Sequence, residues 1–137
     1  MAGNLSVSAD IAASGMKAQA ERLKVIAQNM ANVDSISTTP GGEPYRRQVV
    51  SFQNYVDKAT GAEMVRVDKV VQDMSGFDKK YAPGHPGADA YGYVNLPNVN
   101  PLVEMMDMKE AQRAYDANMN MMKTAREMNS SVLDILR

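Results

Sequence analysis

The 137-residue chain contains no cysteine, no tryptophan and only one histidine. Without cysteine it can have no disulfide, no zinc–thiolate centre and no thiol nucleophile. An excess of charge of one sign is also missing, because fifteen Lys and Arg stand against sixteen Asp and Glu and no segment is a basic arm or an acidic tail. This balance argues against nucleic acid and against anionic membranes as partners.

Long apolar segments are missing as well. No apolar run approaches the roughly 18 residues that a membrane-spanning helix needs, so we expect no direct membrane insertion. Residues 1–30 lack the charged start, apolar stretch and cleavage site of a secretory signal peptide, so any export is expected to leave the N-terminus uncut. Leu, Ile, Val and Phe account for only 26 of the 137 residues, which predicts a small core within one copy.

Proline is absent from both flanks of the chain, since all six prolines lie between residues 40 and 101. Because proline disrupts helix interiors, the flanks are expected to be helical. In the first flank, over residues 5–33, mostly apolar residues recur at intervals of three and four, which predicts an amphipathic helix. This stripe consists of Ala12, Met16, Gln19, Leu23, Ile26, Met30 and Val33. Gly15 lies inside this helix and should cost about 1 kcal/mol relative to alanine unless another backbone comes close.

The second flank, over residues 101–136, begins with Asn100 as a helix cap and Pro101 at the first helical position. Glu104 and Asp107 suit the positive end of its dipole. One stripe at helical spacing consists of Ala111, Ala114, Asn118, Met121, Ala125, Met128, Val132 and Ile135. A second stripe widens the face and consists of Leu102, Met105, Met108, Tyr115, Met119 and Met122. A face this broad can contact more than one neighbour.

Helix length indicates assembly. At about 1.5 Å per residue the two helices would span roughly 44 and 54 Å, whereas a compact globule of this chain length has a diameter of roughly 37 Å. We therefore predict a mainly α protein whose N- and C-terminal helices pair as an antiparallel, coiled-coil-like rod. Other subunits are expected to complete the burial of these helices. The predicted segments are an N-terminal assembly helix (1–36), a central β-rich or extended region (37–100) and a C-terminal assembly helix (101–137).

The central region is expected to form a small β-rich insert. Residues 45–52 and 64–72 alternate partly and are rich in valine, which is typical of half-exposed strands, and 91–96 is a weaker candidate. Proline- and glycine-rich loops at 40–44, 82–88 and 97–101 separate these segments.

No convincing catalytic or metal site is predicted. His85 could pair with Tyr81 and Asp89 in a small hydrolase or lyase, but the loop over 81–89 has no Ser or Cys nucleophile and the chain has no second histidine for a metal. A structural role for His85 in a Pro-Gly turn is therefore favoured, and no cofactor is expected.

Arg46 and Arg47 are interpreted as a solvated or interfacial pair. The methionines of the last flank are interpreted as a packing face that tolerates several partners. A soluble coiled-coil adaptor remains an alternative function.

Several motifs carry a family resemblance. They are Asp10-Ile-Ala-Ala-Ser-Gly-Met-Lys-Ala-Gln19, Asn29-Met-Ala-Asn32, Thr38-Thr-Pro-Gly-Gly-Glu-Pro-Tyr-Arg-Arg47, Tyr81-Ala-Pro-Gly-His-Pro-Gly-Ala-Asp89, Gly92-Tyr-Val-Asn-Leu-Pro-Asn-Val-Asn-Pro101 and Glu104-Met-Met-Asp-Met-Lys-Glu-Ala111. With these motifs, nearly the whole chain resembles the bacterial flagellar basal-body rod proteins, and among them a proximal rod protein.

The resemblance implies a structural subunit of the periplasmic rod, which polymerises into a helical tube and transmits torque. It implies export through the flagellar type III apparatus, and partners that are copies of the chain and other rod proteins. Helix residues expected at the assembly interface are Ala12, Gly15, Met16, Leu23, Ile26, Asn29, Met30, Asn32, Val33, Met105, Met108, Ala111, Tyr115, Asn118, Met121, Met122, Ala125, Met128, Val132 and Ile135. The family loop motif comprises Tyr45, Arg46, Arg47, Tyr81, Pro83, Gly84, His85, Pro86, Asp89, Gly92, Tyr93, Pro97 and Asn98.

Overall fold

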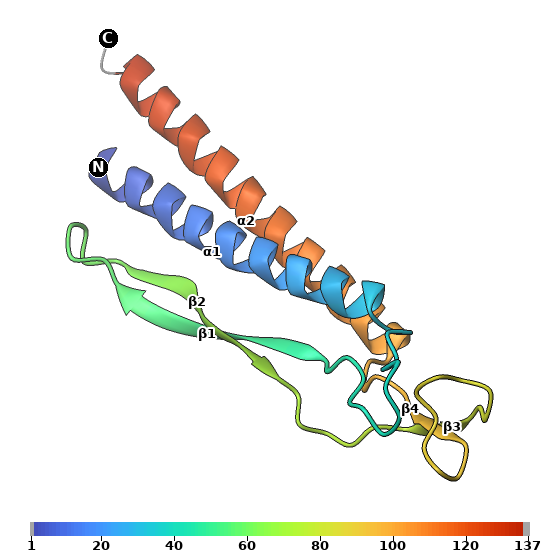
Figure 1. Ribbon diagram of the computed structural model, residues 1–137. Helices are drawn as coiled ribbons and strands as arrows, with labels where there is room; N and C mark the ends of the chain where they lie inside the picture. The colour runs from blue at the N-terminus through green and yellow to red at the C-terminus, as the bar shows by residue number, and fades with distance from the viewer. Residues whose placement is uncertain (1, 136–137) are drawn as a thin grey trace. The chain divides into compact units, whose positions relative to one another are not determined.

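The computed structural model describes residues 2–135 and contains two long helices separated by strands and loops (Figure 1). In chain order the elements are α1 (Ala2–Ala31), β1 (Gln48–Val56), β2 (Glu63–Gln72), β3 (Lys79–Tyr81), β4 (Tyr93–Asn95) and α2 (Pro101–Ile135). The prediction of two terminal helices around a small β insert is confirmed. The last residue of the predicted second helix, 136, lies outside the described residues.

The helix ends follow local chemistry. Asn100 caps α2, because its side-chain oxygen accepts a hydrogen bond from the Leu102 amide at 3.0 Å and its carbonyl accepts one from the Glu104 amide at 3.0 Å. At the end of α1, the Asn32 side chain donates to the Gln28 carbonyl at 2.8 Å. The same carbonyl also accepts from the Asn32 backbone amide at 3.1 Å, so Asn32 closes the last turn through both its backbone and its side chain.

The strands form two separate two-stranded sheets, β1–β2 and β3–β4. In the first sheet, the pairing of Tyr55 with Met64 and of Ser51 with Lys69 shows that β1 and β2 run antiparallel. The second sheet is also antiparallel, with Tyr81 opposite Tyr93. The predicted strands are corrected in three places: β1 covers 48–56 instead of 45–52, β4 covers only 93–95 of the predicted 91–96, and β3 was not predicted.

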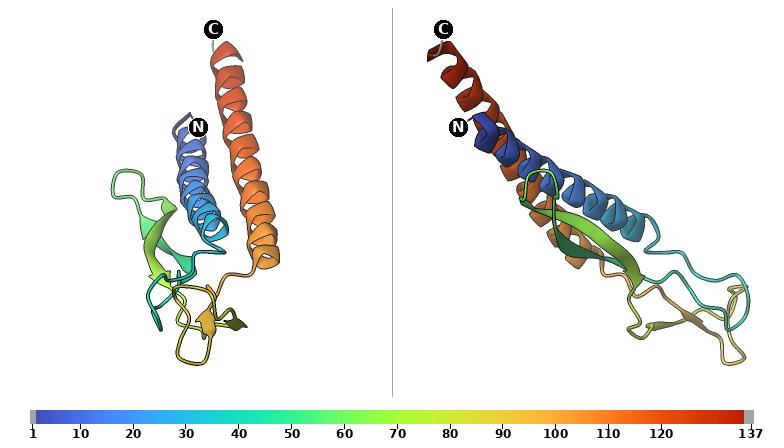
Figure 2. Two further views of the ribbon diagram at one scale, coloured as in Figure 1. Left: turned by 45° about the vertical axis from the view of Figure 1, so that its right-hand side comes forward. Right: turned by 90° about the vertical axis from the view of Figure 1, so that its left-hand side faces the viewer.

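Residue contacts divide the chain into two compact units. Of the described residues, the first unit contains 2–23, 50–69 and 109–135, and the second contains 24–49 and 70–108. Within the first unit, α1 lies between the β1–β2 hairpin and α2, and the start of α1 lies beside the end of α2 (Figures 1 and 2). Contacts of Gly15 with Asn118 and of Arg22 with Glu110 show that the helices run antiparallel there.

The two units have different cores. In the first unit the buried apolar residues are all alanines, namely Ala12, Ala18, Ala111 and Ala125. In the second unit they are the larger Val25, Ile26, Val94 and Val99, joined by the buried polar residues Asn29 and Glu104. Because alanine buries little area, the helix pair of the first unit gains little hydrophobic stabilisation from its own core.

Candidate assembly surface

The residues expected at the assembly interface differ widely in exposure. Those that are buried are Ala12, Gly15, Ile26, Asn29, Ala111 and Ala125. Those that are half-buried are Met16, Leu23, Met30, Asn32, Val33, Met108, Tyr115, Asn118, Met122 and Val132. Met105, Met121, Met128 and Ile135 are exposed. The inner part of each predicted stripe therefore packs within the chain, and its outer part is left on the surface.

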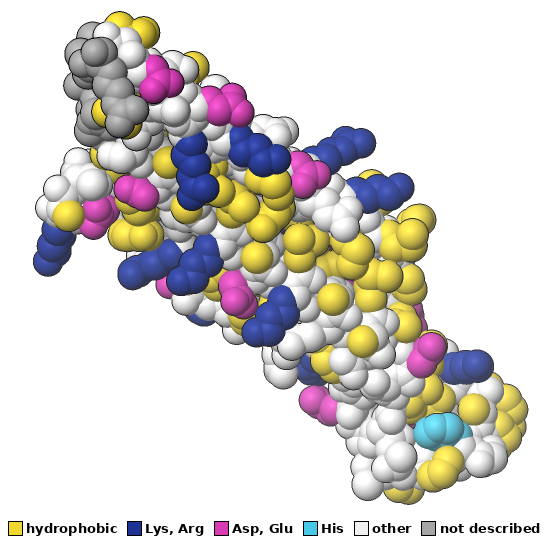
Figure 3. Space-filling view, turned by 90° about the horizontal axis from the view of Figure 1, so that it is seen from above, with side chains coloured by type: hydrophobic (Ala, Val, Ile, Leu, Met, Phe, Trp, Pro, Cys, Tyr) yellow, Lys and Arg dark blue, Asp and Glu magenta, His cyan; other side chains and the backbone are white. Residues whose placement is uncertain are grey.

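The surface of α2 carries further large apolar side chains that the stripes did not include. Val103 and Met106 are exposed near its start, and Leu133 is exposed near its end. Figure 3 shows hydrophobic side chains on the surface over the helices. Exposed contiguous apolar surface of this kind marks an interaction site in a soluble protein.

One apolar groove lies between the start of α1 and the end of α2 in the first unit. It has a volume of about 330 Å³ and is lined by Leu5, Ser8, Ile11, Met121, Thr124, Ala125 and Met128. None of these lining residues is charged, so the groove suits an apolar helix face.

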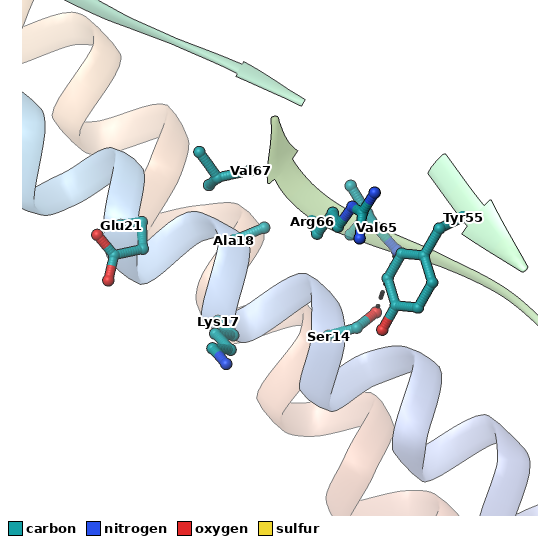
Figure 4. A pocket seen from close by; sticks show the side chains of 8 residues that line it. All are labelled: Ser14, Lys17, Ala18, Glu21, Tyr55, Val65, Arg66 and Val67. Carbon is teal, nitrogen blue, oxygen red and sulfur yellow. Dashed lines mark hydrogen bonds between the residues drawn. The ribbon is translucent and has the colours of Figure 1, made fainter. Parts of the chain in front are cut away.

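A second hollow of about 430 Å³ lies between α1 and the β1–β2 hairpin in the first unit. In Figure 4, Ser14 points toward Val65, and the charged ends of Lys17 and Glu21 point away from the strand. The Val65 amide donates to the Ser14 hydroxyl at 3.4 Å, and this hydroxyl also donates to the Ile11 carbonyl at 2.7 Å. The hollow has no converging set of catalytic groups.

Gly15 is the position where the two helices come closest to a steric limit. It is buried, and its neighbour is the side chain of Asn118. The three atoms nearest to a Cβ placed there all belong to this side chain and not to a backbone. Asn118, a member of the predicted stripe on the second helix, is half-buried.

The second unit contains a buried polar network centred on Asn29, which is 1% exposed. The Asn29 side-chain oxygen accepts hydrogen bonds from the Tyr45 hydroxyl and the Gln48 amide, both at 2.9 Å. Its NH₂ group donates to the Gln48 carbonyl at 2.8 Å and to Glu104 Oε2 at 3.1 Å. One side chain therefore joins the end of α1, the start of β1 and the start of α2.

Arg47 extends this network, because it pairs with three carboxylates of the same unit. Its Nε donates to Glu104 Oε1, its Nη2 donates to Asp107 Oδ2 at 3.2 Å, and its Nη1 lies 3.7 Å from Asp73 Oδ2. The Glu104 side chain is fully buried, so this pairing supplies the countercharge that a buried carboxylate requires. Arg47 is therefore held by carboxylates of its own chain, and the interpretation of Arg46 and Arg47 as a solvated or interfacial pair stays a prediction.

Asn98 fixes the backbone around Arg47. Its side-chain oxygen accepts from the Arg47 amide at 2.7 Å, and its NH₂ group donates to the Asp73 carbonyl and the Ser75 hydroxyl, both at 2.9 Å. Arg46, the adjacent residue, behaves differently. It pairs with exposed Glu43 at 3.1 Å, and its guanidinium lies 4.3 Å from the centre of the Phe77 ring.

Electrostatics in this network follow from burial and charge. Burial, followed by the nearby charge of Glu104, raises the pKa of Tyr45 above its ordinary value. For Arg47, burial alone would lower the pKa, but the hydrogen bond to Glu104 and the charges of Glu104, Asp107 and Asp73 raise it overall. The pKa of Asp73 is lowered, chiefly by a hydrogen bond from the Ser75 amide. The Tyr45 hydroxyl therefore stays protonated and Arg47 stays charged.

The histidine loop contains hydrogen bonds that fix its turns. His85 Nδ1 accepts a hydrogen bond from the Gly87 amide at 3.0 Å. Asp89 accepts from the Tyr91 and Tyr93 amides, both at 2.9 Å, and the bond from Tyr93 is the main cause of its lowered pKa. Both side chains are thus engaged with the backbone of their own loop.

The remaining loop-motif residues gather in the β3–β4 sheet. The rings of Tyr81 and Tyr93 meet edge to face with their centres 5.3 Å apart. Gly92 adopts φ 82° against Tyr81 and Pro83, which requires glycine. Pro97 is buried, whereas Gly84 and Pro86 are exposed. The structure therefore separates the motif into an Arg47–Asn98 group and a Tyr81–Tyr93 group.

Two further properties of the described residues concern function classes. No group of three or more His, Asp or Glu side chains among them is arranged to hold a metal ion. Neither described helix contains an apolar stretch long enough to cross a bilayer.

Two family models match the chain. The model described as "Flagella basal body rod protein" matches residues 10–35, and the model described as "Flagellar basal body rod FlgEFG protein C-terminal" matches residues 90–135. These ranges cover most of α1 and all of α2, the helices that carry the candidate surface. The class of protein is therefore a structural component of the flagellar rod.

Relatives that align with nearly the whole chain identify the family within this class. A flagellar basal-body rod protein FlgC of Agrobacterium fabrum is 44% identical over 133 residues, which cover 97% of this chain and 96% of the relative. FlgC of Salmonella typhimurium is 42% identical, with 92% and 93% covered, and FlgC of Bacillus subtilis is 35% identical, with 93% and 95% covered. The chain belongs to the FlgC family of flagellar basal-body rod proteins.

The family decides between the functions that the sequence left open. The chain is a structural subunit of the basal-body rod and not an enzyme, because its relatives are structural rod proteins. The hydrolase or lyase alternative based on His85 and the unrelated adaptor alternative are both set aside on the same ground.

Proposed function

We propose that this rod subunit polymerises through α1 and α2 into a helical tube that crosses the periplasm and transmits torque. The single observation that carries the proposal is the set of large apolar side chains left exposed along α2, at its start, middle and end. They are Leu102, Val103, Met105, Met106, Met121, Met128, Leu133 and Ile135. A chain that never associated would have no reason to keep so many apolar groups in water.

Energetics support association through these helices. Full burial of a side chain of this size contributes about 1.5–3 kcal/mol, so a few of them outweigh the cost of ordering a helix surface. Methionine adapts to unlike neighbours because it is flexible and polarizable. The surface therefore suits contacts with copies of the chain and with other rod proteins.

The arrangement of the assembly follows from the type of contact. If the exposed face of one subunit meets a different face of the next, the contact does not close on itself and the chain of subunits becomes an open helix. In this proposal, segments 1–36 and 101–137 pair as an antiparallel, coiled-coil-like rod in the inner tube. The central segment 37–100, with the β1–β2 hairpin and the β3–β4 sheet, lies on the outside.

Export and location form a further part of the proposal. The subunit passes through the flagellar type III export apparatus without cleavage of a signal peptide and reaches the periplasmic part of the basal body. The support is membership of the flagellar basal-body rod family, whose resemblance implies this export route. Mass spectrometry of the subunit from purified basal bodies tests this, because a shortened N-terminus would contradict it.

Met121→Asp is the most direct test of the surface, because Met121 is exposed and an aspartate there leaves the chain's own core intact. The variant replaces the native subunit in cells, and incorporation into purified basal bodies is measured. We expect incorporation to fall at least about tenfold, since a buried unpaired carboxylate is costly at an interface. Ile26→Asp is less informative, because Ile26 is buried and this change also disrupts the second unit.

Lys123→Asp is the matched control, since Lys123 is exposed on the same helix but outside the predicted stripes. His85→Ala is a second control in the loop region. Both should enter rods at near-normal levels. Equal loss in Met121→Asp and Lys123→Asp would contradict the proposed surface, and normal entry of Met121→Asp would do so as well.

A further inference from the structure

Two exposed methionines border the apolar groove of the first unit. Met121 and Met128 are seven residues apart, so about two helical turns place them on one face of α2. Their side chains are 62% and 52% exposed. Dissolved small molecules can therefore reach both residues.

The rest of the groove is chemically inert. Its apolar lining comes from Leu5, Ile11 and Ala125, and its polar lining comes from the hydroxyl groups of Ser8 and Thr124. None of these groups reacts with a peroxide, whereas a thioether does. The two methionine sulfurs are thus the only groups in the groove whose polarity a mild oxidant can change.

We propose that Met121 and Met128 form a redox-sensitive modification site, at which oxidation by a peroxide prevents the groove from docking on a neighbouring rod subunit. This inference rests on the proposed function, because it takes the groove to be part of the assembly surface. The oxidant is a peroxide, and the product at each position is methionine sulfoxide.

The chemical step is a balanced oxygen transfer. The thioether sulfur attacks one oxygen of hydrogen peroxide, an S–O bond forms and the O–O bond breaks. Sulfur loses two electrons, the peroxide gains them, and the second oxygen leaves as water after proton transfer. The sulfoxide is polar and is restored to the thioether by a methionine sulfoxide reductase.

Because Met121 and Met128 are exposed in the single chain, their oxidation should affect assembly more than the stability of the fold. In the single chain the new oxygen stays hydrated, so the helix pair loses little stability. On docking, the same oxygen would leave water and enter an apolar contact with no hydrogen-bond donor in the groove lining besides Ser8 and Thr124. Because these two hydroxyls are the only donors that the lining residues offer, removing the sulfoxide oxygen from water is unfavourable, so association is weakened while the fold persists.

The first experiment uses the purified full-length chain and hydrogen peroxide. Peptide mass spectrometry follows the gain of one oxygen at each methionine, and circular dichroism follows the helices. We expect Met121 and Met128 to oxidise within about threefold of the rate of Met74, which is 75% exposed and lies outside the groove. Helix content should not change. Protection of Met121 and Met128, or loss of the helices, would overturn the inference.

The second experiment measures rod incorporation in cells whose native subunit is replaced. Met121→Gln with Met128→Gln imitates the polarity of the sulfoxide and should lower incorporation at least about tenfold. Met121→Leu with Met128→Leu keeps the groove apolar and removes both of its oxidisable sulfurs, so it should assemble normally and be less sensitive to a peroxide pulse that reduces new wild-type rods. Met74→Gln is the matched control and should assemble normally.

The outcomes distinguish this inference from the proposed function. Failure of the unoxidised wild-type subunit to enter rods through α2 would overturn the proposed function itself. Normal entry of the double Gln variant, or equal peroxide sensitivity of the wild-type and double Leu chains, would overturn only the inference drawn here.

Discussion

The side-chain amide of Asn118 lies directly over Gly15: a Cβ atom placed on Gly15 would come within 2.8 Å of Nδ2 and 3.0 Å of Cγ. Real Cβ atoms hardly ever make contacts this short, so the amide would have to move. Glycine in the middle of α1 therefore has a packing reason that offsets its cost to helix stability. The pair is a close contact between α1 and α2 within the first unit.

Gly15→Ala should consequently stabilise the chain by less than the usual gain. Replacing glycine by alanine inside a helix normally stabilises it by about 1 kcal/mol. Here we expect the clash with Asn118 to remove most of that gain. In an Asn118→Ala background the clash is absent, so Gly15→Ala should recover the full gain. Urea unfolding followed by circular dichroism measures the four free energies of this cycle. An equal gain in both backgrounds would show that the contact does not constrain the helices.

Arg47→Ala should destabilise the second unit strongly, because it leaves the buried carboxylate of Glu104 without its main countercharge. Removal of one partner from a buried ion pair typically costs about 3–5 kcal/mol. The adjacent Arg46→Ala is a useful comparison, since it removes packing on Phe77 and a pair with exposed Glu43 but leaves no buried carboxylate without a countercharge, so it should cost less than Arg47→Ala. Urea unfolding followed by tyrosine fluorescence compares the two. Similar losses would mean that Glu104 does not depend on Arg47.

The contrast between these two arginines shows where sequence reasoning stopped. The helices were predictable, because apolar spacing, the proline distribution and the Asn100 cap are local signals. Arg46 and Arg47 look alike in the sequence, yet only Arg47 meets three carboxylates from two distant segments, Asp73 after β2 and Glu104 and Asp107 on α2. Glu104 and Asp107 were explained only by the helix dipole, because nothing local reveals a partner 57 or 60 residues away.

The strands show the same limit. The valine-rich segments indicated β1 and β2, but their ends were displaced because pairing, rather than composition, decides where a strand stops. The three-residue strand β3 has no alternating pattern of its own and forms only because it pairs with β4. Which part of each helical stripe stays exposed was likewise beyond the sequence, since it depends on how the two helices pack.

Gly87→Ala should destabilise the second unit by about 1–3 kcal/mol, the usual cost of forcing extra volume into a packed site. Gly87 is buried, and a Cβ atom there would overlap the carbonyl oxygen of Ser37, a backbone group that cannot rotate away. Gly84→Ala lies in the same loop, where a Cβ atom meets nothing within 4 Å, and should change the free energy of unfolding by less than about 0.5 kcal/mol. Thermal unfolding of both variants measures the difference. Equal stability would indicate that the contact with Ser37 is not maintained.

Acid should loosen the turn that leads into β4. Hydrogen bonds from the Tyr93 and Tyr91 amides lower the pKa of Asp89 in the folded chain below the ordinary value of 3.8. Because the folded pKa is the lower one, Asp89 stabilises the turn above the unfolded pKa and this contribution is lost as pH falls through the folded pKa. Amide exchange at Tyr91 and Tyr93, corrected for intrinsic rates, should therefore accelerate below about pH 4. Asp89→Asn should remove this pH dependence, and an unchanged acid response in that variant would assign it to another group.

Backbone protection should differ between the two units when the chain is alone. The helix pair of the first unit buries only alanines, whereas the second unit buries Val25, Ile26, Val94 and Val99 around its polar network. Amide hydrogen exchange reports the free energy of local opening, so we expect residues 109–135 to exchange much faster than residues 92–104 in the monomer. In assembled rods the exchange of 109–135 should slow by at least about a hundredfold, since neighbouring subunits cover the exposed face. Strong protection of 109–135 in the monomer would contradict a helix pair that depends on its neighbours, because the exposed apolar surface would then play no part in holding it together.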